Sequence, residues 1–172
     1  MATPTNLPAS FVSGAILTAD QMNNLRGAFR VLQVIRDTDT TTRSTTSSSF
    51  TDVTGVSVTI TPQSTTSNIL VIASFLALVA NSSTASNRGA YQITTSGNVA
   101  LSGAEFQLVG TQSYTQSNGF LFQPVTMIGF VSPASVAAQT YKLRFKAEDA
   151  NVTAYVASGD TTTQLYAIEL SA

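Results

Sequence analysis

The sequence contains no cysteine, no histidine and no tryptophan among its 172 residues. Without cysteine the fold uses no disulfide. Without cysteine and histidine, zinc sites of the usual kind are excluded, and so are the Ser-His-Asp and Cys-His arrangements of nucleophilic catalysis. We therefore expect that the protein is not an enzyme, with no catalytic residues, no cofactor and no metal site.

Charged side chains are also scarce. Asp, Glu, Lys and Arg make up 10% of the chain and the net charge is −1, whereas about a quarter is usual in globular domains. No basic patch indicates a nucleic-acid partner, and the apolar run 69–80 is too short to span a bilayer. Such a surface suits a protein that packs into a larger assembly, although a weakly charged monomer stays open as an alternative.

In contrast to its scarcity of charged residues, the chain is rich in strand-forming patterns. Ser and Thr make up about a quarter of it, and β-branched Thr and Val favour strands. Val56, Val58 and Ile60 alternate with polar residues, which predicts a strand with one buried face. After a turn at Pro62, residues 68–79 are apolar at nearly every position, which predicts a strand buried between two layers.

Further strands are predicted along the rest of the chain, at 90–95, 99–101, 120–131, 141–146, 152–156 and 164–170. Ser96-Gly97-Asn98 is a good hairpin turn, and Pro124 favours a bulge or an edge position. The polar stretches 37–49 and 103–119 are interpreted as loops, with an extended edge strand as the alternative for the Thr-rich stretch 37–49. About eight antiparallel strands at roughly ten-residue spacing predict an all-β fold, a jelly roll or β-sandwich.

The N-terminal part follows a different pattern. Residues 1–17 are interpreted as an extended arm. Thr18 and Gln21 have the spacing of a capping box, so a short helix is predicted after the arm. Its apolar residues recur at steps of three, four and three, as in a two-heptad seam. The seam consists of Met22, Leu25, Phe29 and Leu32. It can pack on the core of its own domain, form a short self-associating neck, or dock onto another protein. We divide the chain into residues 1–35, the arm and helix, and 36–172, the head.

Binding residues are harder to assign. The acidic residues show neither the facing pair of a glycosidase nor a ladder of calcium ligands, so we interpret them as solvated turn residues. Lys142, Arg144 and Lys146 form a comb that either faces solvent or grips an anionic glycan or an acidic subunit. A Gln- and Ser-rich loop is the candidate ligand-contact loop, because amides and an aromatic ring suit contact with a sugar or a protein. Its residues are Gln112, Tyr114, Gln116 and Asn118, and Tyr114 could instead pack in the core or between subunits.

Two stretches resemble a known module. Residues 7–35 (LPASFVSGAILTADQMNNLRGAFRVLQVI) carry a Ser-Gly-x-x-Leu-Thr-Ala lead into the predicted helix. Residues 47–71 (SSSFTDVTGVSVTITPQSTTSNILV) carry the pattern Ser-Phe-x-Asp-Val-Thr-Gly. Both are similar to fibre and decoration proteins of bacteriophage virions. The resemblance implies an N-terminal segment that attaches to the particle and a jelly-roll head that trimerises, broadly like tumour-necrosis-factor or C1q heads.

This resemblance sets the functional expectation. It implies a homotrimeric structural protein made in the host cytoplasm and carried on the outer surface of the virion. The protein would be a capsid decoration (cement) protein or a short head fibre that contacts the major capsid protein or another virion protein. The alternative is a tail or collar fibre, or a receptor-binding protein that mediates host attachment through a surface glycan. Neither reading involves nucleic acid or insertion into a membrane, and the family brings no catalytic residues.

Overall fold

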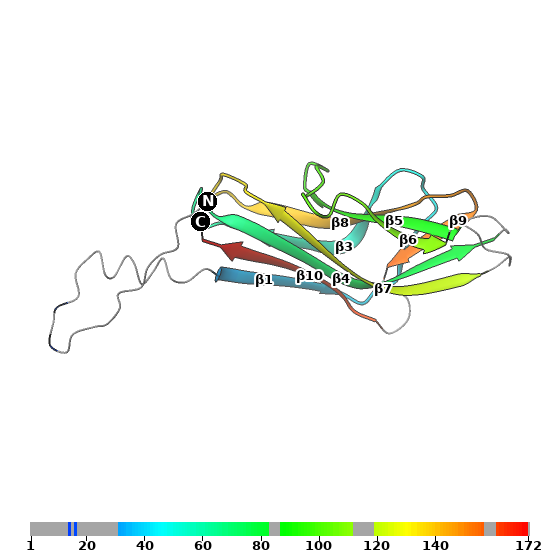
Figure 1. Cartoon of the computed structure of the whole chain (residues 1–172), viewed down its shortest axis with the longest axis horizontal. Coiled ribbons are helices and arrows are strands. Elements are labelled where there is room, and N and C mark those ends of the chain that lie inside the picture. The colour runs from blue at the N-terminus through cyan, green and yellow to red at the C-terminus, as the bar shows by residue number, and fades with distance from the viewer. Residues whose placement is uncertain are drawn as a thin grey trace.

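The structure, a computed structural model, describes residues 14, 16, 31–82, 87–111, 119–156 and 161–171. Its elements are ten β-strands in two antiparallel sheets that pack face to face (Figure 1). The prediction of an all-β, sandwich-like fold is confirmed. The predicted arm and helix lie outside the described residues, apart from Gly14 and Ile16, and so do Met22, Leu25 and Phe29.

The larger sheet has six strands organised around a central strand. Its members are β1 (Val31–Asp39), β2 (Arg43–Thr45), β4 (Asn68–Asn81), β7 (Phe120–Val131), β9 (Val152–Val156) and β10 (Thr163–Leu170). β7 pairs with β4 along one side. On the other side, β10 pairs with the first half of β4 and β9 pairs with the second half. β1 then pairs with β10 and β2 with β9, so β4 holds both ends of the sheet together.

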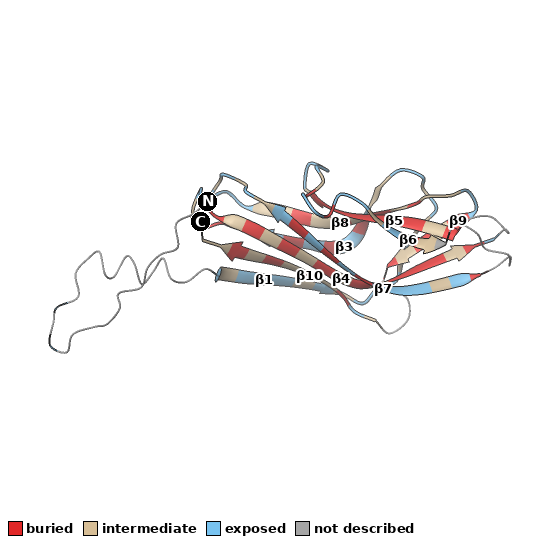
Figure 2. Cartoon of the chain, in the orientation of Figure 1, coloured by how far each residue is buried: buried red, intermediate tan, exposed pale blue. Residues whose placement is uncertain are grey.

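The smaller sheet has four strands, in the order β3-β8-β5-β6. They are β3 (Thr51–Ile60), β5 (Asn87–Thr95), β6 (Gln107–Thr111) and β8 (Gln139–Ala147). Along β8, buried residues alternate with half-buried ones, as period-2 patterning predicts (Figure 2). The two inner faces meet in one core, whose fully buried side chains include Val58, Val71, Tyr91, Leu143 and Leu165.

A bulge in β3 explains the Asp-Val-Thr-Gly motif. The register between β3 and β8 shifts between Asp52 and Ser57, and the extra residues let both Val53 and Val56 reach the core. Gly55 has φ +85°, and a Cβ there would lie 2.9 Å from a carboxylate oxygen of Asp39. The motif is therefore structural, because glycine adopts this conformation without steric cost.

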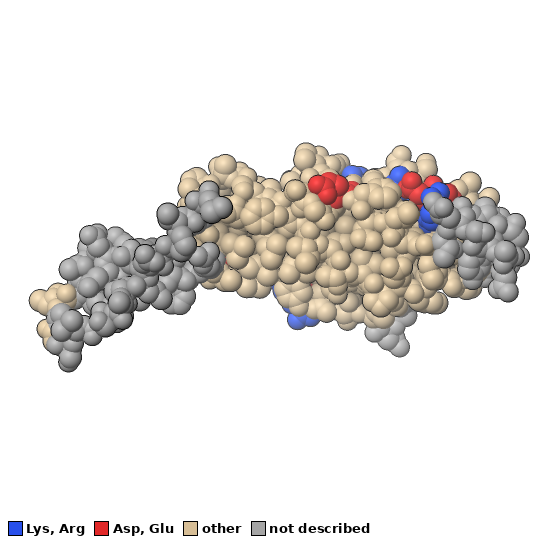
Figure 3. Space-filling model, in the orientation of Figure 1, with Lys and Arg blue, Asp and Glu red and all other residues tan. Residues whose placement is uncertain are grey.

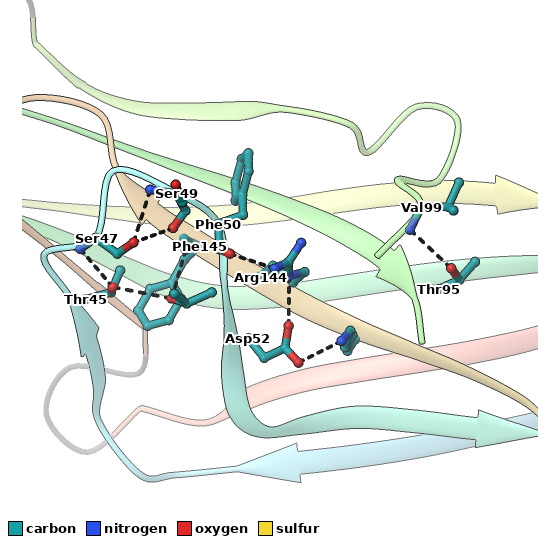
Figure 4. A network of polar contacts seen from close by, with 11 residues as sticks. Thr45, Ser47, Ser49, Phe50, Asp52, Thr95, Val99, Arg144 and Phe145 are labelled. Carbon is teal, nitrogen blue, oxygen red and sulfur yellow. Dashed lines mark hydrogen bonds and ion pairs between the residues drawn. The ribbon is translucent and has the colours of Figure 1, made fainter. Parts of the chain in front are cut away.

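The segment that leads into β3 is fixed by polar contacts (Figure 4). Ser47 and Ser49 bond each other, since the Ser47 hydroxyl donates to the Ser49 carbonyl and accepts from its N–H. Arg144 donates to the Phe50 carbonyl at 2.6 Å and to the Asp52 carboxylate at 2.8 Å. Serine hydroxyls and one arginine thus satisfy a stretch whose sequence looks like a linker.

Three sequence predictions are corrected by the strand pairing. Leu32, the last residue of the predicted helical seam, lies in β1, because residues 31–35 pair with β10 as part of the sandwich. The predicted loop 37–49 contains the end of β1 and all of β2, and the predicted loop 103–119 contains β6. β2 is an edge strand, as the alternative for the Thr-rich stretch predicts. Backbone pairing, rather than an apolar face, holds β2 and β6 in place.

The predicted hairpin turn and the edge position of Pro124 are confirmed, whereas the strand predicted at 99–101 is not. The hairpin turn is confirmed, with Asn98 at φ 66° and a hydrogen bond from Thr95 N–H to the Val99 carbonyl. The strand predicted at 99–101 is reduced to an isolated bridge at Ala100. Pro124 does lie on an edge, because within the described residues β4 is the one strand that pairs with β7, and on its other side β7 makes an isolated bridge from Phe130 to Ser102.

Candidate functional site

The outer face of the six-stranded sheet is apolar, and it begins on β4. Ile69, Val71 and Ala73 of this strand are buried in the core, whereas Leu70 and Ile72 point to the opposite side and are half-buried. The prediction that this strand is buried between two layers is therefore wrong. Its second apolar face is the outer surface of the sandwich.

β7 extends this surface with its most exposed side chains. Phe120, Phe122, Ile128 and Phe130 are 60%, 56%, 51% and 44% exposed. The register places Phe130 opposite Leu70 on β4. Directly opposite residues of neighbouring strands share one face of a sheet, so these side chains form one surface.

The same rows continue across the other two strands. Ile168 of β10 lies opposite Leu70, and Val34 of β1 lies opposite Ile168. A transverse row of apolar side chains thus crosses four strands. We call this surface the apolar face, and it consists of Val34, Leu70, Ile72, Leu76, Phe122, Ile128, Phe130 and Ile168.

Charge is nearly absent from the apolar face. In the strands that the structure describes, Arg36 is the one charged residue on this side, and its guanidinium lies 5.7 Å from the centre of the Tyr166 ring. The view in Figure 3 agrees, since charged side chains gather along the upper rim and the broad surface over β4, β7 and β10 shows almost none. Depletion of charge at an apolar patch is typical of protein interfaces.

The charged comb on the smaller sheet is paired within the chain, its three cations with two carboxylates. Lys142 and Arg144 contact the Asp52 carboxylate at 2.7 and 2.8 Å, and Lys146 contacts Glu148 at 2.7 Å. Burial raises the pKa of Asp52, but the two cations outweigh it and hold that pKa below its usual value. The comb therefore has little positive charge to offer an anionic glycan or an acidic subunit.

A hollow of about 670 Å³ lies at the end of the sandwich farthest from Val31. Its lining includes the ends of β4 and β7, the start of β9 and the turn between β8 and β9. We call it the tip hollow and define it by Ala80, Ser82, Phe120, Asn151, Thr153 and Tyr155. Hydroxyls, an amide and two aromatic rings are thereby brought together from three separate parts of the chain.

Gly119, the residue that follows the candidate ligand-contact loop in the sequence, lies next to this hollow. Gln112, Tyr114, Gln116 and Asn118 lie outside the described residues, but Gly119 follows them directly. The Gly119 N–H donates to the Asn81 side-chain oxygen at 2.9 Å, and the Asn81 N–H donates to the Gly119 carbonyl at 3.1 Å. Asn81 also lines the tip hollow, so Gly119 is held at its edge.

Glu169 is a functional residue of the fold that the sequence interpretation missed. It is fully buried on the inner side of β10, not in a solvated turn. Its carboxylate accepts hydrogen bonds from Gln33 Nε2 at 2.5 Å and from the Gln63 N–H at 2.7 Å. Burial raises its pKa, but these donors, with the nearby Ser67 hydroxyl and Ser64 backbone, lower it below its usual value overall. The side chain therefore fastens the β3–β4 turn to β1 and β10.

The chain gives little indication of other kinds of site or of relatives. Among the described residues, no group of acidic side chains could hold a metal ion, and this part of the chain forms no helix long and apolar enough to cross a membrane. Comparison of the chain with models of protein families and with curated proteins gives no match. The apolar face and the tip hollow are therefore the two surfaces that indicate a function.

Proposed function

We propose that this protein is a homotrimeric structural component of the outer surface of a bacteriophage particle. In this proposal the chain from Val31 onward, where β1 begins, forms a jelly-roll head, and the segment before it attaches the head to the capsid as a decoration (cement) protein or short head fibre. The two motif-bearing stretches and the all-β sandwich support the family resemblance. The apolar face is the observation that carries the proposal of self-association.

Burial of the apolar face would contribute favourably to association. Full burial of one Ile or Phe side chain contributes about 1.5–3 kcal/mol. Phe122, Ile128 and Phe130 are each about half exposed, so covering them contributes roughly half of that value each. Together with Leu70, Ile72 and Ile168, each subunit gains several kcal/mol. Soluble monomers rarely leave a contiguous apolar patch of this kind uncovered.

The edge of β7 favours packing through side chains over addition of a strand. A free edge strand offers a row of N–H and C=O groups to another chain. Pro124, near the middle of β7, has no N–H to offer. Copies of the chain should therefore meet through the apolar face, which leaves the backbone edge of β7 unused.

The test of self-association is a mass measurement. We expect light scattering on a sizing column to give the mass of three chains for the wild-type protein. Ile128→Lys and Phe130→Lys place a charge inside the interface and should give a folded monomer by circular dichroism. Val99→Lys is the matched control, because Val99 is 66% exposed and lies outside the apolar face, so the trimer should persist. A monomeric wild-type protein would refute the proposed assembly.

The attachment proposal has a separate test. Deletion of residues 1–17 should abolish incorporation into particles while leaving the head folded and trimeric. Full incorporation of the shortened protein would contradict the proposed anchor. Copy number in purified particles separates the two architectures, because hundreds of copies indicate a decoration protein and a few dozen at one vertex indicate a tail or collar fibre.

A receptor-binding fibre is the second candidate function. One specific observation favours it, namely the tip hollow at the end of the sandwich opposite Val31. If the N-terminal segment holds the particle, this end points away from it.

A further inference from the structure

We propose that the tip hollow is a binding site for a neutral saccharide. The inference rests on the hollow itself, and only its outward orientation rests on the proposed function. The hollow adjoins the apolar face, since Phe122 and Tyr155 both lie opposite Leu78, but it lies beyond the rows of Ile128 and Phe130, whose substitutions test the interface.

The strand register places small side chains at the base of the hollow and aromatic side chains beside them. Ala80 lies opposite Phe120 on one side and opposite Thr153 on the other, so these three side chains form one row across β7, β4 and β9. Tyr155 lies in the next row, opposite Leu78. A methyl group and a hydroxyl thus lie between two rings, one of which, Phe120, is 60% exposed. Aromatic faces of this kind stack on the apolar C–H face of a sugar ring.

The polar rim is held in place by the surrounding chain. The Ser82 N–H and hydroxyl both donate to the Asn151 carbonyl, at 3.0 and 3.3 Å. Arg88 holds the neighbouring Asp149 with two hydrogen bonds, at 2.8 and 2.6 Å. The β8–β9 turn is therefore fixed before any ligand arrives, which reduces the entropy lost on binding. Thr46 and Ser48 complete the rim with further hydroxyls.

The charges around the hollow favour a neutral ligand. Its two acids are already paired, Asp149 with Arg88 and Glu148 with Lys146. Arg88 keeps the pKa of Asp149 below its usual value although burial opposes this, so Asp149 stays ionised at neutral pH. The lining contains no lysine or arginine, and a phosphate or sialic acid would meet two carboxylates without a free cation. Hydroxyls, amides and aromatic rings without net positive charge match an uncharged sugar.

The experiment uses the full-length protein and a defined panel of probes. Saturation-transfer NMR followed by calorimetry would test neutral trisaccharides of glucose, galactose, mannose, rhamnose and N-acetylglucosamine. A sialylated trisaccharide, a mannose phosphate and an uncharged tripeptide complete the panel. We expect at least one neutral trisaccharide to bind. Tyr155→Ala should weaken that binding by about tenfold, as loss of one stacking contact implies.

A second variant tests the site without removing any contact group. Ala80→Leu fills the base of the hollow and should abolish binding. Val99→Ala, which removes an exposed apolar side chain away from the hollow, should leave affinity unchanged. Each variant is checked for fold by circular dichroism and for mass by light scattering. The proposal is overturned if no neutral trisaccharide binds, if the charged probes or the tripeptide bind in preference, or if Ala80→Leu binds as the wild type does.

These outcomes are distinguishable from failure of the proposed function. A monomer that still binds a neutral trisaccharide in an Ala80-dependent manner would refute the trimer and keep the site. A trimer without saccharide binding would refute the site and keep the assembly.

Discussion

Replacing Glu169 with Ala should destabilise the head more than any loss of a surface charge. The carboxylate is fully buried and accepts hydrogen bonds from Gln33 and from the Gln63 N–H. A hydrogen bond to a charged group contributes about 1.5–3 kcal/mol, and both bonds that Glu169 accepts are partly buried. For two such bonds we expect a loss of about 3–6 kcal/mol in the free energy of unfolding, a large share of the 5–15 kcal/mol usual for a domain.

The assay is urea unfolding at pH 7, followed by circular dichroism at one fixed protein concentration, because self-association makes stability depend on concentration. Glu105→Ala is the matched control. Glu105 is an exposed carboxylate that accepts one hydrogen bond, from the Gly103 N–H at 2.9 Å. Its loss should cost less than about 1 kcal/mol. A cost below about 1 kcal/mol for Glu169→Ala would refute the assignment of Glu169 as the residue that fastens the turn.

The pH dependence gives a second, independent check. The folded pKa of Glu169 lies below its ordinary value of 4.5, so the folded state favours the ionised form. Its contribution to stability is therefore complete above the ordinary pKa and is lost as the pH falls through the folded pKa. The difference in stability between wild type and Glu169→Gln should shrink as the pH falls below 4.5. An equal difference at pH 7 and pH 3 would show that the charge is unimportant.

Three further substitutions test other contacts. Gly110→Ala should cost about 3 kcal/mol or more in urea unfolding, because φ is +137° and a Cβ would lie 1.8 Å from the Asn87 carbonyl oxygen; a loss under 1 kcal/mol would contradict this. Tyr91→Phe should cost about 1–3 kcal/mol, since the buried hydroxyl donates to the Tyr155 carbonyl at 2.9 Å, and unchanged stability would contradict it. Pro124→Val restores an edge N–H and should raise thioflavin-positive aggregation on mild heating, whereas wild-type behaviour would show that Pro124 does not protect the edge.

The strands with an amphipathic pattern could be predicted from sequence alone. Val58 and Ile60 alternate with threonines, and Leu143 and Phe145 alternate with cations, so the inner face was determined by period 2. β2 and the end of β1 could not be predicted in this way. Their Thr- and Ser-rich residues bury no apolar face, and only the pairing with β9 and β10 makes them strands.

The candidate surfaces were only partly accessible to sequence reasoning. A strand with two apolar faces looks the same whether the second face meets its own chain or another subunit, and β4 was assigned to the wrong case. Glu169 could have been found, since it continues the inward alternation of Leu165 and Ala167. The tip hollow could not, because Ala80, Phe120 and Tyr155 meet only through the register of β4.

The central position of β4 also has a mechanical consequence. Twelve residue pairs link β4 to β7, while β10 and β9 share its other side. A tensile force between the end near Val31 and the end with the tip hollow acts along these strands (Figure 1). The inter-strand hydrogen bonds lie across the strands, so such a load shears many of them together rather than opening them one at a time. A head built in this way should transmit traction from an attached end to a bound end without unravelling.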